Sequence, residues 1–138
     1  MTLAYCSPHC RAVLNPNVRI VLAAVFGDKR GLVLMSSKPG DYQLICDKGF
    51  CRRVEAGDVV EFRCPVCAES LTSRKLDHFC ELEMVDSEKP DKRPGKVLFS
   101  RVCDERATFV YDGDSMREYG EAAQKLRDRI DIEGDWGW

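Results

Sequence analysis

A Cys-Pro-Val-Cys segment at residues 64–67 constrains the fold of this chain more than any other stretch of its sequence. Two cysteines separated by two residues can direct both thiolates at one ion, and the proline tightens the turn between them. Residues 59–63, which precede the segment, have the composition of a strand. A tetrahedral ion needs four ligands, so further ligands must come from elsewhere in the chain. The sequence therefore predicts a metal site that joins segments far apart in sequence.

Six further cysteines can supply the missing ligands. The arrangement that we favour places one Zn²⁺ ion between two cysteine turns, with the ligands Cys6, Cys10, Cys64 and Cys67. A competing arrangement pairs the Cys64 turn with Cys46 and Cys51, because the intervening hairpin then has the usual length for a zinc ribbon. The sequence also allows a second four-sulfur site, with the ligands Cys46, Cys51, Cys80 and Cys103. The alternative for Cys80 and Cys103 is burial as small apolar side chains.

The two cysteine turns have related sequences. Cys10 is followed four residues later by Leu14, and Cys67 is followed four residues later by Leu71. Each leucine can pack beneath its turn. We therefore interpret the two turns as the two halves of one ribbon.

Histidines offer an alternative to sulfur at both candidate sites. The turn from Cys6 to Cys10 is one residue wider than the usual spacing and contains His9. His78 lies two residues before Cys80. Each histidine is either a metal ligand or a residue that faces solvent.

The start of the chain bears on the state of its eight cysteines. It has no basic segment leading into a long apolar one, and the apolar run at residues 18–26 is too short to cross a bilayer. These features predict a cytoplasmic protein without a membrane partner. A reducing cytoplasm favours metal-binding thiolates over disulfides, although disulfides are the alternative for so many cysteines.

The pattern of apolar residues and turns predicts a mainly β fold with a C-terminal α-helix. Glycine-rich or charged turns separate short runs of strand composition, which is typical of antiparallel hairpins. The expected strands are residues 18–26 and 32–36 as one hairpin, 42–45, 59–63, 79–85, and 96–102 with 107–111 as a second hairpin. Residues 1–76 then form a zinc-ribbon domain with an inserted hairpin, and residues 77–138 form a second unit, which can pack with the first as one domain.

The helix is expected to begin at Ser115. Ser115 and Glu118 have the spacing of a capping box. An apolar face follows at helical spacing, made of Met116, Tyr119, Ala123, Leu126 and Ile130. Gly120 weakens such a helix by about 1 kcal/mol relative to alanine. The tail at residues 134–138 contains two tryptophans and is interpreted as an interaction anchor or as disorder.

The chain resembles small uncharacterised bacterial tandem zinc-ribbon proteins over roughly its first hundred residues. The resemblance rests on residues 5–10, the turn at residues 40–42, residues 57–67 and the segment at residues 80–85. It implies a second ribbon with two more cysteine pairs. Each pair keeps one member, Cys80 or Cys103, while Asp77 or His78 and Phe99 stand near the other positions. The resemblance therefore implies a degenerate second ribbon that packs through apolar contacts.

The motifs indicate a binding protein and not an enzyme. Four thiolates close the coordination of zinc, and the sequence has no histidine-glutamate zinc motif, nucleophile elbow or phosphate loop. We therefore expect a structural zinc protein that acts as an adaptor or accessory subunit with a protein partner.

Two other functions follow from different residues. A zinc-ribbon regulator that binds nucleic acid is supported by the basic pairs at residues 52–53 and 74–75. It is not favoured, because the formal net charge of −2 attracts no phosphate backbone. A cysteine-based redox switch would depend on Cys46 and Cys51.

Overall fold

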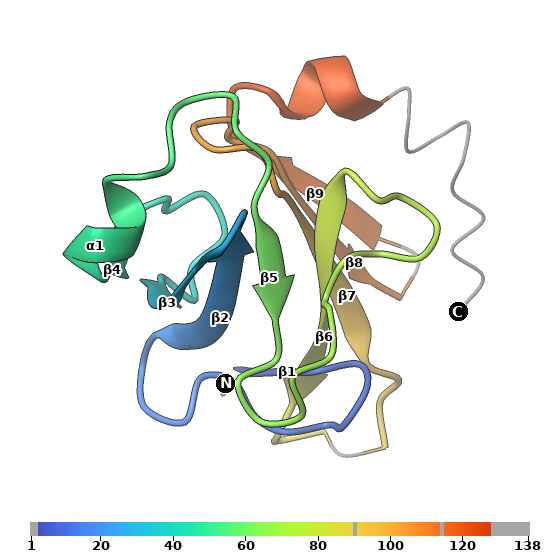
Figure 1. Ribbon diagram of the computed structural model, residues 1–138. Coiled ribbons are helices and arrows are strands. Elements are labelled where there is room, and N and C mark those ends of the chain that lie inside the picture. The colour runs from blue at the N-terminus through green and yellow to red at the C-terminus, as the bar shows by residue number, and fades with distance from the viewer. Residues whose placement is uncertain (1–2, 90, 114, 128–138) are drawn as a thin grey trace.

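The computed structural model describes residues 3–89, 91–113 and 115–127, which form a mainly β molecule with a short C-terminal helix (Figure 1). The strands are β1 (Leu3–Cys6), β2 (Ile20–Phe26), β3 (Lys29–Met35), β4 (Leu44–Cys46), β5 (Glu61–Arg63), β6 (Phe79–Asp86), β7 (Gly95–Ser100), β8 (Thr108–Asp112) and β9 (Ser115–Tyr119). The helices are α1 (Lys48–Cys51) and a helical turn at residues 123–127. None of the helices in these residues is long and apolar enough to cross a membrane.

The strands form two antiparallel sheets. One sheet has the order β1-β6-β7-β8-β9, and the other has the order β4-β3-β2-β5. The chain passes between the sheets twice, since β1 pairs with β6 whereas β2 pairs with β5. β1 lies in the first of the two units expected from the sequence and β6 lies in the second. The two units therefore share a sheet.

The predicted strands and hairpins are confirmed, with boundaries shifted by a few residues. The first hairpin is β2 and β3, and its tight turn contains Gly27 at a φ of +61°. This left-handed conformation favours glycine, because other residues have a Cβ that crowds the backbone there. The second hairpin is β7 and β8, as expected.

The prediction of a helix beginning at Ser115 is wrong. Residues 115–119 form β9, which pairs along its whole length with β8, and helix begins only at residue 123. The Asp112-Gly113 turn explains the difference, because Gly113 has a φ of +62° and reverses the chain into a hairpin. Cross-strand pairing with β8 therefore outweighs the capping signal of Ser115 and Glu118. Ile130 and the tail at residues 134–138 lie outside the described residues.

The apolar residues gather in three buried clusters. The largest lies between the sheets and contains residues from both halves of the chain, including Tyr5, Leu22, Leu71 and Leu82. A second cluster packs Ala123 and Leu126 of the C-terminal helix against the five-stranded sheet. The third lies under the four-stranded sheet and includes the ring of Phe50 from α1.

Candidate metal centre

Two turns of the same conformation follow β1 and β5. We call residues 7–11 the first knuckle and residues 64–68 the second knuckle; equivalent positions differ by 57, since 64 − 7 = 57. Three backbone hydrogen bonds recur at matched positions. Ser7 N donates to Ala12 O (3.0 Å) as Cys64 N donates to Glu69 O (2.9 Å), and Arg11 N donates to Ser7 O (2.9 Å) as Ala68 N donates to Cys64 O (2.9 Å). Leu14 N donates to Tyr5 O (2.7 Å) as Leu71 N donates to Phe62 O (2.8 Å). The two segments are therefore structural repeats.

The last residue of each knuckle has a left-handed backbone. Arg11 has a φ of +66° and Ala68 a φ of +64°, although neither is a glycine. Such residues are uncommon, because the Cβ crowds the following carbonyl. The strain occurs at the same place in both repeats. It turns the chain back so that Leu14 and Leu71 are buried beneath their knuckles, as the sequence predicts.

The knuckles meet and bring three thiols together. The Sγ atoms of Cys10, Cys64 and Cys67 all lie within 4.8 Å of one another, and those of Cys10 and Cys64 are 3.6 Å apart. A Zn–S distance of about 2.3 Å places neighbouring sulfurs of a tetrahedron about 3.8 Å apart. Figure 1 shows the loops after β1 and β5 next to each other at the foot of the molecule. Three thiols at this spacing can hold a metal ion.

Hydrogen bonds and burial shift the pKa values of Cys10 and Cys67 in opposite directions. The backbone N–H of Ala12 and then the Ser7 hydroxyl lower the pKa of Cys10 to about 7. The N–H of Glu69 lowers the pKa of Cys67, but burial and the neighbouring Cys64 and Cys10 thiols raise it above the ordinary value. Metal ligation requires the thiolate form. Cys10 therefore supplies a thiolate more readily than Cys67 near neutral pH.

Cys64 is the innermost of the three thiols. Its side chain is buried, and its Sγ accepts hydrogen bonds from Val66 N (3.4 Å) and Cys67 N (3.5 Å). Backbone N–H groups directed at a sulfur fix its orientation, as in metal-binding cysteine turns.

The structure places Cys6 outside this group. Cys6 is the last residue of β1 and is buried in the sheet, where it bridges to Val13. Burial, followed by the charge of Glu83, raises the pKa of the Cys6 thiol. The residue at the position equivalent to Cys64 is instead Ser7, which was not predicted as a site residue. The repeat could have revealed it, because Ser7-Pro8-His9-Cys10 aligns with Cys64-Pro65-Val66-Cys67 without a gap.

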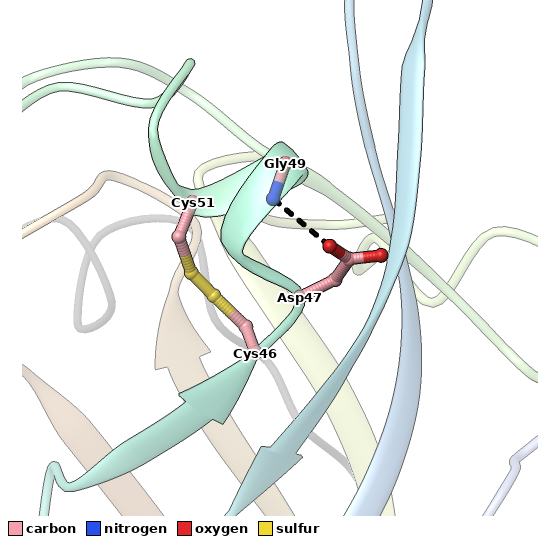
Figure 2. The surroundings of a disulfide bond; sticks show 4 residues. All are labelled: Cys46, Asp47, Gly49 and Cys51. Carbon is pink, nitrogen blue, oxygen red and sulfur yellow. Dashed lines mark hydrogen bonds between the residues drawn. A yellow bond between two sulfur atoms is a disulfide. The ribbon is translucent and has the colours of Figure 1, made fainter.

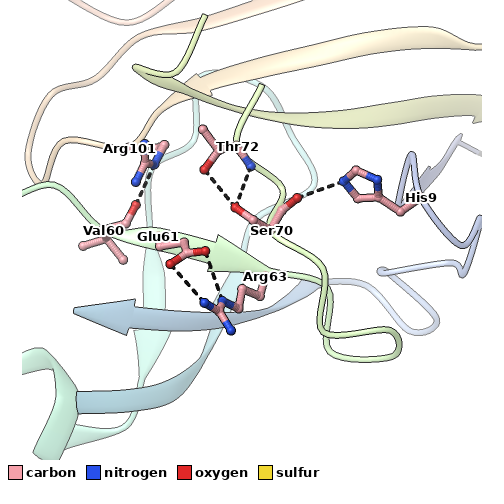
Figure 3. A network of polar contacts seen from close by, with 7 residues as sticks. All are labelled: His9, Val60, Glu61, Arg63, Ser70, Thr72 and Arg101. Carbon is pink, nitrogen blue, oxygen red and sulfur yellow. Dashed lines mark hydrogen bonds and ion pairs between the residues drawn. The ribbon is translucent and has the colours of Figure 1, made fainter. Parts of the chain in front are cut away.

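The two histidines are held by other polar groups. His9 Nε2 lies 2.8 Å from the carbonyl oxygen of Ser70, across the contact between the knuckles (Figure 3). The Ser70 hydroxyl donates to Thr72 Oγ1 at 3.0 Å in the same figure. His78 donates to the Glu105 carboxylate, which also accepts a hydrogen bond from Ser100 Oγ at 2.6 Å. Neither histidine belongs to the thiol group in the described part of the chain.

The four cysteines of the predicted second site do not come together. Cys46 at the end of β4 and Cys51 at the end of α1 are joined by a disulfide (Figure 2). Cys80 is fully buried in the largest apolar cluster, and burial raises its pKa well above the ordinary value. Cys103 lies in the turn after β7. The disulfide also occupies the sulfurs of Cys46 and Cys51, which the competing arrangement would use as ligands together with Cys64 and Cys67.

A capped turn holds the disulfide in place. Asp47 accepts a hydrogen bond from Gly49 N at 2.9 Å and caps α1 between the two cysteines (Figure 2). Cys51 is exposed to solvent. Reductants in solvent can therefore reach this disulfide directly.

The basic pairs expected to contact nucleic acid lie on the surface. Arg52 and Arg53 are exposed, but the neighbouring Phe50 ring is buried and cannot stack on a base. Arg74 and Lys75 line a hollow of about 320 Å³ beside His9 of the first knuckle.

Comparison of the chain with protein-family models, characterised proteins and solved structures gives no match. The case for a metal ion rests on the geometry of the three thiols.

Proposed function

We propose that this protein binds one Zn²⁺ ion through Cys10, Cys64 and Cys67, and that the ion has a structural role in a protein that serves as an adaptor. The observation that carries this proposal is the meeting of two matched knuckles with three thiols inside 4.8 Å. Soft thiolates favour zinc over magnesium or calcium, and sulfur-rich zinc sites are usually structural. When bound at structural sites, zinc contributes on the order of 10 kcal/mol or more to folding.

The position of the centre supports a structural role. Each knuckle follows a strand of a different sheet, β1 in one and β5 in the other. An ion that binds both knuckles therefore ties the two sheets at the same end. This explains how a chain of 138 residues with a modest core can keep two small sheets packed.

An apolar sheet surface supports the adaptor role. We define the outer apolar face as Ala23, Leu32, Leu34 and Ile45, which line a shallow hollow of about 700 Å³ on the four-stranded sheet. Leu32 is 56% exposed and Ile45 is 51% exposed. Contiguous apolar surface of this kind is typical of protein interfaces. The partner is expected to be a protein that offers apolar side chains to this sheet.

Native mass spectrometry of freshly purified, reduced protein tests the metal centre. We expect one zinc ion per chain, lost on chelation together with thermal stability. Cys64→Ala should remove the ion, whereas Cys80→Ala should keep it. The pair is matched, because both side chains are buried and both variants lose one buried thiol. Equal metal content in the two variants would contradict the proposal.

The same measurement on protein isolated from its native cells tests the adaptor role. The spectrum should contain a complex with a second subunit. The double variant Leu32→Lys, Ile45→Lys should lose that subunit and keep the zinc ion, because neither residue is near the knuckles. A wild-type protein that is isolated only as a single chain would contradict the role of adaptor.

A second candidate, the redox switch, is supported by one specific observation. The Cys46–Cys51 disulfide is solvent-accessible at Cys51 and does not involve the thiols of the metal centre. Such a pair can change state without ejecting the metal. The buried Phe50 ring between the two cysteines would respond to that change through the apolar cluster under the sheet.

A further inference from the structure

The repeat of the two knuckles identifies a fourth position beside the three thiols. In the second knuckle, the Sγ of Cys64 accepts hydrogen bonds from Val66 N and Cys67 N. In the first knuckle, the Oγ of Ser7 accepts the equivalent bonds from His9 N (3.2 Å) and Cys10 N (3.4 Å). The hydroxyl oxygen of Ser7 therefore takes the place that a metal-binding sulfur takes in the other repeat.

The burial of the four positions follows the same symmetry. Ser7 and Cys64, which open the knuckles, are 0% and 1% exposed. Cys10 and Cys67, the fourth residues of the knuckles, are more exposed. An ion held by the thiols would thus have an inner pair and an outer pair of neighbours, one member of each pair coming from each knuckle.

Other candidates for the fourth position are directed elsewhere. Cys6 precedes Ser7 and belongs to the strand, where its backbone bridges to Val13. The equivalent residue of the second repeat is Arg63, which bridges to Ser70 in the same way and pairs with Glu61. The His9 ring is bonded to the Ser70 carbonyl.

We propose that Ser7 Oγ is the fourth ligand, so that the metal centre has three sulfur ligands and one oxygen ligand. This inference rests on the proposed metal binding by Cys10, Cys64 and Cys67. A hydroxyl oxygen is a harder and weaker ligand for zinc than a thiolate. The centre therefore releases its ion more readily than a four-thiolate ribbon, and Ser7 is the residue that sets this affinity.

Cobalt substitution in the presence of a reductant tests the proposal. The sulfur-to-cobalt charge-transfer absorption grows with the number of bound thiolates. Wild-type protein should show the intensity of three thiolates, and Ser7→Cys should raise it by about one third and tighten metal binding. Ser7→Ala should weaken cobalt binding by about tenfold or more, since even the loss of a residue that only hydrogen-bonds to a metal ligand has an effect of this size. The ligand-field bands should also shift.

Two control variants separate this role from simple destabilisation. Ser73 is another buried serine whose Oγ accepts a backbone N–H, from Leu76 at 3.3 Å, so Ser73→Ala should leave the cobalt spectrum unchanged. Cys6→Ala should also keep the wild-type spectrum. A drop of about one quarter in Cys6→Ala would identify Cys6 as the fourth ligand and overturn the proposal. A Ser7→Ala variant with the wild-type cobalt spectrum and the wild-type cobalt affinity would overturn the proposal as well.

The outcomes distinguish this proposal from the one on which it rests. If wild-type protein shows no thiolate absorption with cobalt, the metal centre itself is disproved and the role of Ser7 with it. If the absorption is present and only the response of Ser7 variants is missing, the three-thiol centre stands and the oxygen ligand is rejected.

Discussion

Gly120 lies where the backbone leaves no room for a side chain. Its φ is +95°, and a Cβ would lie 2.2 Å from the carbonyl oxygen of Arg106. Gly57 has nearly the same φ, +93°, with nothing within 4 Å of such a Cβ. We predict that Gly120→Ala lowers the free energy of unfolding by about 3 kcal/mol or more, and Gly57→Ala by about 1 kcal/mol.

Urea denaturation of both variants isolates the steric cost of the added methyl group, because both positions share the same backbone strain. Similar losses in the two variants would contradict the packing around Gly120. This glycine also shows the limit of sequence reasoning, which placed it inside a helix with a small cost. Its role depends on the distant Arg106 carbonyl, a contact that no local pattern contains.

Glu105 provides a pH-dependent contribution to stability. Burial raises its pKa, but hydrogen bonds from Ser100 and His78 outweigh burial and hold the pKa below its ordinary value. A carboxyl group with a lowered folded-state pKa stabilises the fold above its unfolded pKa. That contribution is lost as the pH falls below about 4.5 and through the folded pKa.

Glu105→Gln should therefore reduce this part of the acid sensitivity. We expect the difference in urea midpoint between wild type and variant to be largest near pH 7 and to shrink toward about pH 3. Any release of metal by acid affects both proteins and cancels in the difference. Glu121→Gln, which changes an exposed carboxylate, serves as the control. A difference that stays constant with pH would contradict the role of the network.

At the scale of elements, the disulfide joins β4 to α1. It closes a short loop, since the sequence separation of Cys46 and Cys51 is 5. Chain-entropy arguments give a stabilisation of about 2 kcal/mol for a loop of this length. The double variant Cys46→Ser, Cys51→Ser should lose about that amount in denaturation experiments and keep its metal content. Loss of the metal would show instead that these two cysteines are ligands.

The elements differ in how far their sequences specify them. The hairpins were predictable because each combines a local turn signal with residues of strand composition. β9 was not, although Asp112-Gly113 is itself a hairpin signal, because residues 115–126 also carry a helical apolar pattern. Ala123 and Leu126 of that pattern are buried as expected, whereas Met116 is 38% exposed. Pairing with β8 makes the first half of the segment a strand, and apolar packing of Ala123 and Leu126 holds the second half as a helix.

The group of three thiols was predictable in part for a similar reason. The spacing of Cys64 and Cys67 is a local signal, and the matched leucines pointed to Cys10 as a member of the opposite turn. Which residue opens the first knuckle depends on where β1 ends, and strand ends are the least certain feature of a sequence prediction. Moving that boundary by one residue exchanges Cys6 for Ser7, because neighbouring side chains of a strand point to opposite faces.

At the scale of the whole molecule, the strand that enters each knuckle pairs with the strand that leaves the other. β1 pairs with β6, and β5 pairs with β2. The two segments around the knuckles are therefore interlocked, and neither completes its hydrogen bonding without the other. Contacts of this kind link residues far apart in sequence, which is typical of slowly folding β proteins.

This interlocking sets an order of events during translation. When the ribosome has made β1 and the first knuckle, the partner strand β6 has not yet been translated, because it begins only at Phe79. The nascent chain must therefore carry an unpaired β1 segment and a free Cys10 thiol until its later half emerges. Under the proposed function, the three thiols can bind their ion together only after Cys67 has left the exit tunnel. We expect cells short of the ion to accumulate newly made chains that chaperones must protect from aggregation.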